Sequence, residues 1–274
     1  NYLYMAQQNG AVIQAESEVA DVIPHGQANG AEGYVVKWRS STTFFHRHGE
    51  FKTRGIIFAG GVLGTVKLLL QLKKVSLPHL SDKIGSRIRT NSESLIGVTT
   101  FDKQTAFSDG IAIGSILHTD AYSHLEPVRY PAGSGFWRLL MSPMAHGAKP
   151  LIRIGKVLLD WTRHPVQNMK CYFVSDWAKK TQILLFMRTI NDTLRFSAGL
   201  FGMGSSLEKG NPPTAFIPEA KTLAEAYAKI VNGKPTILLT ETILGIPTTA
   251  HILGGCAMGK DRDEGVIDRD HRVF

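Results

Sequence analysis

The sequence is poor in cysteine and has no long apolar run. Two of its 274 residues are cysteine, Cys171 and Cys256, too few for a disulfide framework, so we expect both to be reduced. No apolar stretch is long enough to cross a bilayer as a helix. Charged residues make up 20% of the chain and hydrophobic residues 43%, a balance that excludes a disordered chain. Length and apolar content are those of a folded protein with one large domain or two ordinary ones.

The net charge of +8 does not come from one cluster of basic residues. Basic residues are scattered, with small groups only at Arg153, Lys156 and Arg163 and at Lys179 and Lys180. Proteins that track phosphates usually have a clustered basic stripe with interleaved aromatic residues. We therefore expect a solvated basic surface and no nucleic-acid partner.

Residues 151–163 combine cations on one side of a predicted helix with Leu, Ile and Trp elsewhere. A helix of this kind can make transient contact with a membrane surface. The pattern also fits a core helix whose Lys and Arg stems cover apolar surface, and we favour this second interpretation. Neither pattern indicates an oligomeric state.

One histidine, His251, stands in a run of small residues at 249–259. Glycines let backbone N–H groups approach a bound ring or phosphate closely, and histidine titrates near neutral pH, so it can take a proton from an alcohol. The segment therefore indicates a catalytic base beside a flat cofactor. The alternative is that His251 caps or packs a glycine-rich turn. Cys256 lies nearby, but two potential ligands without a further cluster do not make a metal site, and we expect no metal.

Residues 54–70 predict a short apolar strand, a glycine turn and an apolar helix. Free amides and the positive dipole end at a helix N-terminus favour a phosphate, and glycines let it come close. The spacing is not Gly-x-Gly-x-x-Gly, however, and glycine also lets a helix pack tightly on a sheet. An anion site and tight packing therefore both remain open for this segment.

Taken together, these segments resemble the glucose–methanol–choline family of flavin-dependent alcohol oxidoreductases, and within it the bacterial cholesterol-oxidase-like branch. The resemblance runs over nearly the whole chain, and its most specific part is the segment 246–268. It implies oxidation of an alcohol to a carbonyl, with hydride transfer to FAD. The segments that carry it are 1–4, 18–19, 56–70, 77–85, 108–113, 124–130 and 246–268.

The same resemblance implies roles for individual residues. His251 is similar to the active-site histidine beside the flavin, and Val19 to the position whose backbone meets the adenine of FAD. Ala59, Gly60 and Gly64 are similar to the turn that lies along the cofactor. Gly254 and Gly255 are similar to the loop that follows the active-site histidine. The implied cofactor contacts are Val19, Ala59, Gly60, Gly64, Gly254 and Gly255.

Departures from the family pattern bear on the chemistry. The family begins with a glycine fingerprint that holds the FAD pyrophosphate and ends with a segment carrying an Asn partner for the histidine. Neither is in this sequence, so we expect it to be an internal part of a longer chain, inactive alone. Sterol oxidases carry a Glu shortly after a Pro-Ala-Gly step, whereas here Gly133 is followed by Ser134, Gly135 and Phe136. A carboxylate base from that place is therefore in doubt.

The predicted fold class is α/β plus α+β. We expect an interrupted FAD-binding, Rossmann-like domain with a β-meander, and a substrate domain built on a mostly antiparallel sheet covered by helices. The expected domains are 1–91 (FAD-binding, part), 92–245 (substrate-binding) and 246–274 (FAD-binding, returning segment). Predicted strands are 11–15, 18–23, 33–38, 43–47, 55–59, 94–101, 111–118, 125–130 and 183–190, and predicted helices end near residue 8, follow residue 59 and span 220–231.

Three functional interpretations follow. The leading one is FAD-dependent oxidation of a bulky secondary alcohol, such as the 3β-hydroxysteroid cholesterol, to a ketone. The second keeps the family but assigns a non-steroid alcohol and an acceptor other than oxygen. The third is a non-catalytic remnant that binds a lipid or a partner. A substrate pocket from Tyr130, Phe136 and Trp137 suits a sterol, with Phe101, Phe107, Ile113, Phe186 and Met187 as further candidates, although core packing explains these residues equally well.

Overall fold

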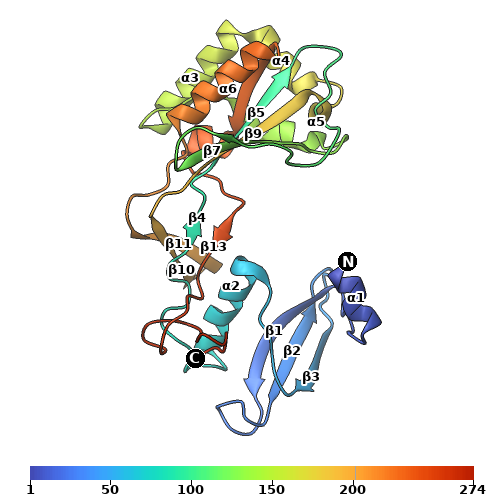
Figure 1. The fold of residues 1–274 in the computed structure, drawn as a ribbon, viewed down its shortest axis with the longest axis vertical. Helices are drawn as coiled ribbons and strands as arrows, with labels where there is room; N and C mark the ends of the chain where they lie inside the picture. Colours follow the sequence, from blue (N-terminus) through green and yellow to red (C-terminus); the bar gives the residue numbers. More distant parts are fainter. Residues whose placement is uncertain (201) are drawn as a thin grey trace. The chain divides into compact units, whose positions relative to one another are not determined.

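The computed structural model describes residues 1–200 and 202–274, which form two compact units (Figure 1). Each unit gathers segments that are far apart in the sequence. The predicted FAD-binding and substrate-binding roles of the domains are functional statements and stay predictions. Unit 1 comprises Asn1–Ile88, Leu194–Glu208 and Leu253–Phe274, and unit 2 comprises Arg89–Thr193 and Lys209–Ile252.

Unit 1 contains an antiparallel meander of three strands, β1 (Ser17–Pro24), β2 (Tyr34–Ser40) and β3 (His48–Thr53). Val22 of β1 pairs with Val36 of β2, and both side chains are buried. The predicted β-meander is therefore confirmed, although its third strand begins at His48 rather than at residue 43.

A loop held by Ser40 explains the later start of β3. The Ser40 hydroxyl bonds the Thr43 hydroxyl at 2.5 Å and accepts the Arg47 N–H at 2.9 Å, and the Ser40 carbonyl lies 2.6 Å from the His46 ring. These side-chain contacts compete with strand pairing, so residues 43–47 form a loop.

Helix α2 (Gly61–Lys74) follows the glycine turn, as predicted. Its buried side chains, Val66, Leu69 and Leu72, recur at helical spacing and form part of the core of unit 1. The predicted strand at 55–59 is wrong, because within the described residues no neighbouring strand pairs with it. The other elements of this unit are α1 (Tyr2–Gln8) and most of the two-stranded sheet of β10 (Thr193–Gly199) and β11 (Gly202–Lys209).

Two further strand predictions are wrong. Residues 11–15 are exposed and irregular, since apolar character without a pairing partner does not make a strand. Residues 111–118 are extended only at β6 (Leu117–His118). Before it, the Arg129 N–H donates to the Ala112 carbonyl and the Arg129 side chain to the Ile111 carbonyl, which leaves a single bridge from Ile113 to Val128.

Unit 2 is built on a six-stranded antiparallel sheet in the order β6-β7-β9-β5-β12-β8. The predicted antiparallel sheet with helices packed on it is confirmed, and the fold is a mixture of helices and antiparallel sheets. The remaining strands of this sheet are β5 (Ser94–Thr100), β7 (Ser123–Val128), β8 (Met141–Pro143), β9 (Thr181–Arg188) and β12 (Gly233–Leu238).

Both faces of this sheet are covered. On one face, Ile96 and Phe186 pack in the cluster that contains Ala224 of helix α6 (Pro218–Ile230). On the other face, Ile183 packs with Trp177 of the short helix α5 (Trp177–Lys180). Because neither face meets water, the first seven residues of β9 are all buried instead of alternating.

Helices α3 (Pro150–Arg163) and α4 (Pro165–Phe173) of unit 2 lie beside the sheet (Figure 1). Helix α3 contacts β8, and α4 contacts β12. Short strands β4 and β13 stand where the sequence passes between units. The bounds are α3 (Pro150–Arg163), α4 (Pro165–Phe173), the 3-10 helix η1 (Gly135–Leu140), the π-helix η2 (Thr240–Leu244), β4 (Arg89–Thr90) and β13 (Ile252–Leu253).

Candidate active site

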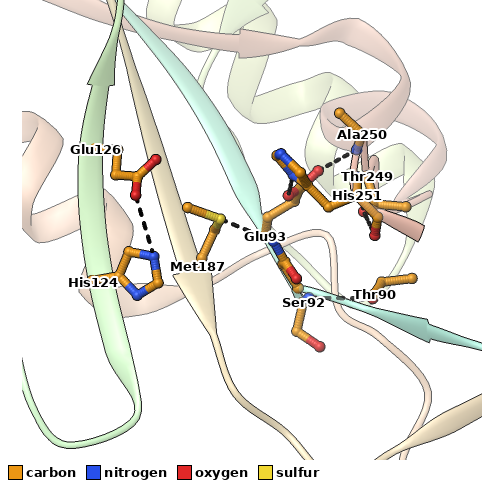
Figure 2. Close-up of polar contacts among 10 residues, drawn as sticks. Thr90, Ser92, Glu93, His124, Glu126, Met187, Thr249, Ala250 and His251 are labelled. Carbon is orange, nitrogen blue, oxygen red and sulfur yellow. Dashed lines mark hydrogen bonds and ion pairs between the residues drawn. The ribbon is translucent and has the colours of Figure 1, made fainter. Parts of the chain in front are cut away.

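The clearest polar constellation of unit 2 joins His251 to Glu93. The His251 Nδ1 atom lies 2.8 Å from the Glu93 Oε2 atom, and the Ala250 N–H donates to Glu93 Oε1. Figure 2 shows the Glu93 carboxylate reaching toward both groups. The Glu93 side chain is fully buried, whereas 47% of the His251 side chain is exposed. A buried carboxylate therefore holds one edge of an imidazole that solvent or a ligand can reach.

The segment before β5 fixes the place of Glu93. Ser92 has a φ of 43°, which is uncommon for a residue other than glycine. Its N–H donates to the Thr90 hydroxyl at 3.2 Å (Figure 2), while the Asn91 carbonyl accepts the Arg188 N–H at 2.8 Å. The bend at Ser92 is thus tied to the end of β9, and Glu93 enters β5 with a defined direction.

A second buried carboxyl, Glu241, lies on the π-helix η2, a type of local widening that often occurs at functional sites. Only 4% of the residue is exposed. Burial raises the pKa of Glu241 to about 7; Thr248 beside the carboxyl lowers it, and the charge of Glu93 raises it further. Neither Glu241 carboxyl oxygen has a well-aligned hydrogen bond within the described residues, and the same holds for the hydroxyl of neighbouring Thr242.

Glu241 and Thr242 line a cavity of about 470 Å³ within unit 2. Its wall also includes Arg153, whose guanidinium donates to the Ile243 carbonyl at 2.9 Å. His146 in the same wall stacks on Phe216, with ring centroids 4.0 Å apart. The cavity therefore combines orphan polar atoms with an aromatic surface.

The cofactor residues predicted in β1 and at the α2 turn belong to unit 1 and are exposed. Val19 is 39% exposed, and Ala59, Gly60 and Gly64 are also classed as exposed. A Cβ atom added at Gly64 would meet nothing within 4 Å, and the nearest atom to one at Gly60 is the Thr65 hydroxyl at 3.6 Å. Open space over a helix N-terminus fits the close approach of a dinucleotide, so the residues present are compatible with FAD.

The two glycines after the histidine, in contrast, have a structural requirement of their own. Gly254 has a φ of +100° and Gly255 a φ of +85°. A Cβ at Gly254 would collide with the Arg87 carbonyl oxygen, and one at Gly255 would lie 2.6 Å from the Val66 side chain. Close packing in unit 1, against backbone at Gly254 and against side chains at Gly255, thus explains both glycines, and their predicted contact with the cofactor stays a prediction.

The three predicted pocket aromatics lie together in unit 2. The ring centroid of Trp137 is 6.1 Å from that of Tyr130 and 6.3 Å from that of Phe136. Tyr130 also packs against Trp177 in the core, whereas Phe136 is 66% exposed. Their role as substrate contacts stays a prediction.

The further pocket candidates do not line one pocket. Phe186 is buried in the core below α6, and Phe101 lines a groove beside α4. Phe107 lies against Tyr227 of α6, and Ile113 bridges to β7. Met187 accepts a hydrogen bond from the Asn91 side chain at 3.1 Å.

Neither Glu93 nor Glu241 was among the site residues predicted from the sequence. Glu93 precedes the buried strand β5, and Glu241 is the lone charge within 235–250. A single carboxylate in an apolar stretch is rarely buried without a partner or a function, so this pattern was a usable signal. The pairing of Glu93 with His251, 158 positions away, had no such signal.

Helix α3 differs from the expected core helix. Its single buried residue is Arg153, while Leu151, Leu158 and Leu159 are 80%, 61% and 45% exposed. The core interpretation is therefore wrong, and transient membrane-surface contact stays a prediction. Flotation with anionic liposomes at low salt tests it, and a protein that stays at the bottom of the gradient would remove it.

The described residues contain neither a cluster of potential metal ligands nor a membrane-spanning helix. Among residues 1–200 and 202–274, no group of three or more His, Cys, Asp or Glu side chains is arranged to hold a metal ion. In the same residues, no helix combines the length and apolar character needed to span a bilayer.

Comparison with curated proteins gives clear relatives. The chain is 37% identical, over 282 aligned positions, to a protein of Acinetobacter baumannii named cholesterol oxidase; the alignment covers 100% of this chain and 50% of the relative. It is 31% identical over 278 positions to proteins named cholesterol oxidase from two strains of Mycobacterium tuberculosis, covering 95% of this chain and 48% of each relative. The chain spans about half the length of the curated relatives it matches. No family model matches the chain.

Proposed function

Because the chain belongs to the glucose–methanol–choline family of oxidoreductases, we propose that this protein is an FAD-dependent enzyme that oxidises a bulky secondary alcohol to a ketone. A 3β-hydroxysteroid such as cholesterol is the proposed substrate, in line with the names of the relatives. The observation that carries the chemistry is the half-exposed imidazole of His251, anchored on the buried Glu93.

Unit 1 is proposed to be part of a Rossmann-like FAD-binding domain, together with the returning segment after His251. When bound, FAD supplies the hydride acceptor. Val19, Ala59, Gly60 and Gly64 would hold it through exposed backbone at the meander and at the N-terminus of α2. The Gly254–Gly255 turn would add backbone contacts.

Unit 2 is proposed to bind the alcohol and handle its proton. His251 has its Nδ1 edge against Glu93, so its Nε2 edge is the one that can meet a ligand. The imidazole accepts the hydroxyl proton as the C–H bond breaks, or holds the alcohol oxygen in place during that step. The aromatic cluster of Tyr130, Phe136 and Trp137 supplies an apolar surface for a bulky ring system.

A second candidate function keeps the chemistry and changes the substrate. Gly135 stands where sterol oxidases carry a Glu, and this favours a non-steroid alcohol and an acceptor other than oxygen. Turnover of cholesterol with peroxide formation separates the two candidates. A non-catalytic protein that binds a lipid or a partner would oxidise neither cholesterol nor another alcohol.

The test is an absorbance spectrum of the purified protein followed by single-turnover mixing with cholesterol. Oxidised flavin bands that bleach on mixing support the proposed function. Absence of flavin both from these 274 residues and from the longer chain expected to contain them refutes it, and flavin that does not bleach refutes the sterol substrate. His251→Ala should retain flavin and slow its reduction by about 10²–10⁴-fold, the usual contribution of a general base. His124→Ala is the matched control, since His124 lies 3.7 Å from Glu126 in the same unit. Equal rates for wild type and His251→Ala would refute the role of His251.

A further inference from the structure

We propose that Glu93 is a positioning residue that fixes the tautomer of His251, with Nδ1 as hydrogen-bond donor and Nε2 as proton acceptor. The inference rests on the proposed function, because it explains how His251 would be ready to take a proton. It adds to that function a residue from the start of β5, far from the histidine in sequence.

The carboxylate has two well-defined partners. Glu93 Oε2 lies 2.8 Å from His251 Nδ1, and Oε1 accepts the Ala250 N–H (Figure 2). An ionised carboxylate can only accept hydrogen bonds. The Nδ1 atom must therefore carry the hydrogen, and in the neutral ring the lone pair is then on Nε2. This is the tautomer that a proton acceptor facing a ligand needs.

The surroundings keep this arrangement from relaxing. The Glu93 side chain has no exposed surface, so water does not compete for its oxygens. The main chain around Ser92 is tied to the Thr90 hydroxyl and to the end of β9, which limits movement of the carboxylate. The histidine is held from its own segment as well, since its N–H lies 3.3 Å from the Thr249 hydroxyl.

The Ala250 N–H makes Glu93→Gln a sharp probe. This donor requires an oxygen opposite it, so the Gln carbonyl oxygen should face Ala250 and the NH₂ group should face His251 Nδ1. Nδ1 would then have to accept, and the hydrogen would move to Nε2. The variant differs from wild type by one NH₂ for one oxygen, yet reverses the tautomer. Reversal of a histidine tautomer by an acid-to-amide change has a large effect in serine proteases.

One further titratable group bears on any pH profile. Burial raises the pKa of Glu241, on η2, and the charge of Glu93 raises it further. Glu241→Gln removes that group and leaves the Glu93–His251 contact intact. A pH profile that changes in Glu93→Gln and not in Glu241→Gln is therefore assigned to the His251 pair.

The experiment is ¹⁵N NMR of the protein labelled at histidine ring nitrogens, at about pH 9, where an ordinary imidazole is neutral. His251→Asn assigns the resonances. Wild type should show protonated Nδ1 and unprotonated Nε2, and Glu93→Gln should show the reverse. Glu126→Gln, at the looser 3.7 Å contact with His124, is the matched control and should leave His251 unchanged. An Nε2–H tautomer in wild type overturns the inference even if Glu93→Gln does not fold.

Flavin reduction provides the second measurement. Glu93→Gln should lower the limiting rate constant of flavin reduction at least ~100-fold and leave the apparent Kd of the alcohol within about 3-fold, because the proton acceptor is lost while the binding surface remains. Glu93→Asp keeps an acceptor-only group and should retain the Nδ1–H tautomer and recover part of the rate. If Glu93→Gln reverses the tautomer but neither it nor His251→Ala slows reduction, the proposed role of His251 fails while the tautomer assignment stands. If His251→Ala is slow and Glu93→Gln has wild-type tautomer and rate, the inference about Glu93 fails alone.

Discussion

Replacement of Glu241 by Gln should remove the loss of folding stability that ionisation of the buried Glu241 carboxyl causes as pH rises. Glu241 is 4% exposed, and burial raises its pKa from the usual 4.5 to about 7. Between these two values the folded state binds more protons than the unfolded state, so stability falls as pH rises. Below about pH 4.5 the carboxyl is neutral in both states, and above about pH 7 it is ionised in both.

The size of the effect follows from the shift. A pKa difference of about 2.5 units at ~1.4 kcal/mol per unit corresponds to roughly 3 kcal/mol. A Gln side chain carries no charge at any pH. The stability difference between Glu241→Gln and wild type should therefore move in favour of the variant by roughly 3 kcal/mol between pH 4.5 and pH 8.

Urea unfolding followed by tryptophan fluorescence measures this difference. Trp177 is buried at 2% exposure in unit 2, which makes it a suitable reporter. Use of the difference between two proteins at each pH cancels the other titrating groups. Glu219→Gln, an exposed carboxyl of the same unit, is the control and should leave the pH dependence of wild type in place. Parallel pH curves for Glu241→Gln and wild type would show that the Glu241 carboxyl is not buried as described.

Two further predictions separate packing from ligand contact. Gly254→Ala should destabilise unit 1 by at least about 1 kcal/mol, because its φ is +100° and the new Cβ would meet the Arg87 carbonyl oxygen. A Cβ added at Gly64 meets nothing within 4 Å, so Gly64→Ala should stabilise α2 by about 0.5–1 kcal/mol in urea unfolding. The same variant should release flavin, and retention of wild-type flavin would count against cofactor contact at Gly64. Phe186→Ala should cost about 3–5 kcal/mol, since Phe186 is 1% exposed in the main core. Phe173→Ala, at 75% exposure, should stay within about 0.5 kcal/mol of wild type, and equal losses for the two Phe variants would contradict the packing of the sheet against α6.

The regular elements with strong local signals were predictable. The glycine turn before α2, the apolar periodicity of α6 and the apolar runs of β5 and β9 led to correct assignments, because each signal lies within one short window. The strands expected at 11–15 and 55–59 were wrong for the opposite reason. Strand formation depends on a partner elsewhere in the chain, and apolar composition does not supply one.

The residue pattern was enough to establish that the protein is folded, that it resembles an oxidoreductase family and that His251 is its most conspicuous candidate base. What that histidine touches follows only from the tertiary structure. Glu93 reaches His251 only because the bend at Ser92 brings the start of β5 to the segment before β13. Local propensity acts over a few residues, whereas burial of a carboxylate and its hydrogen bond to an imidazole 158 positions away are properties of packing.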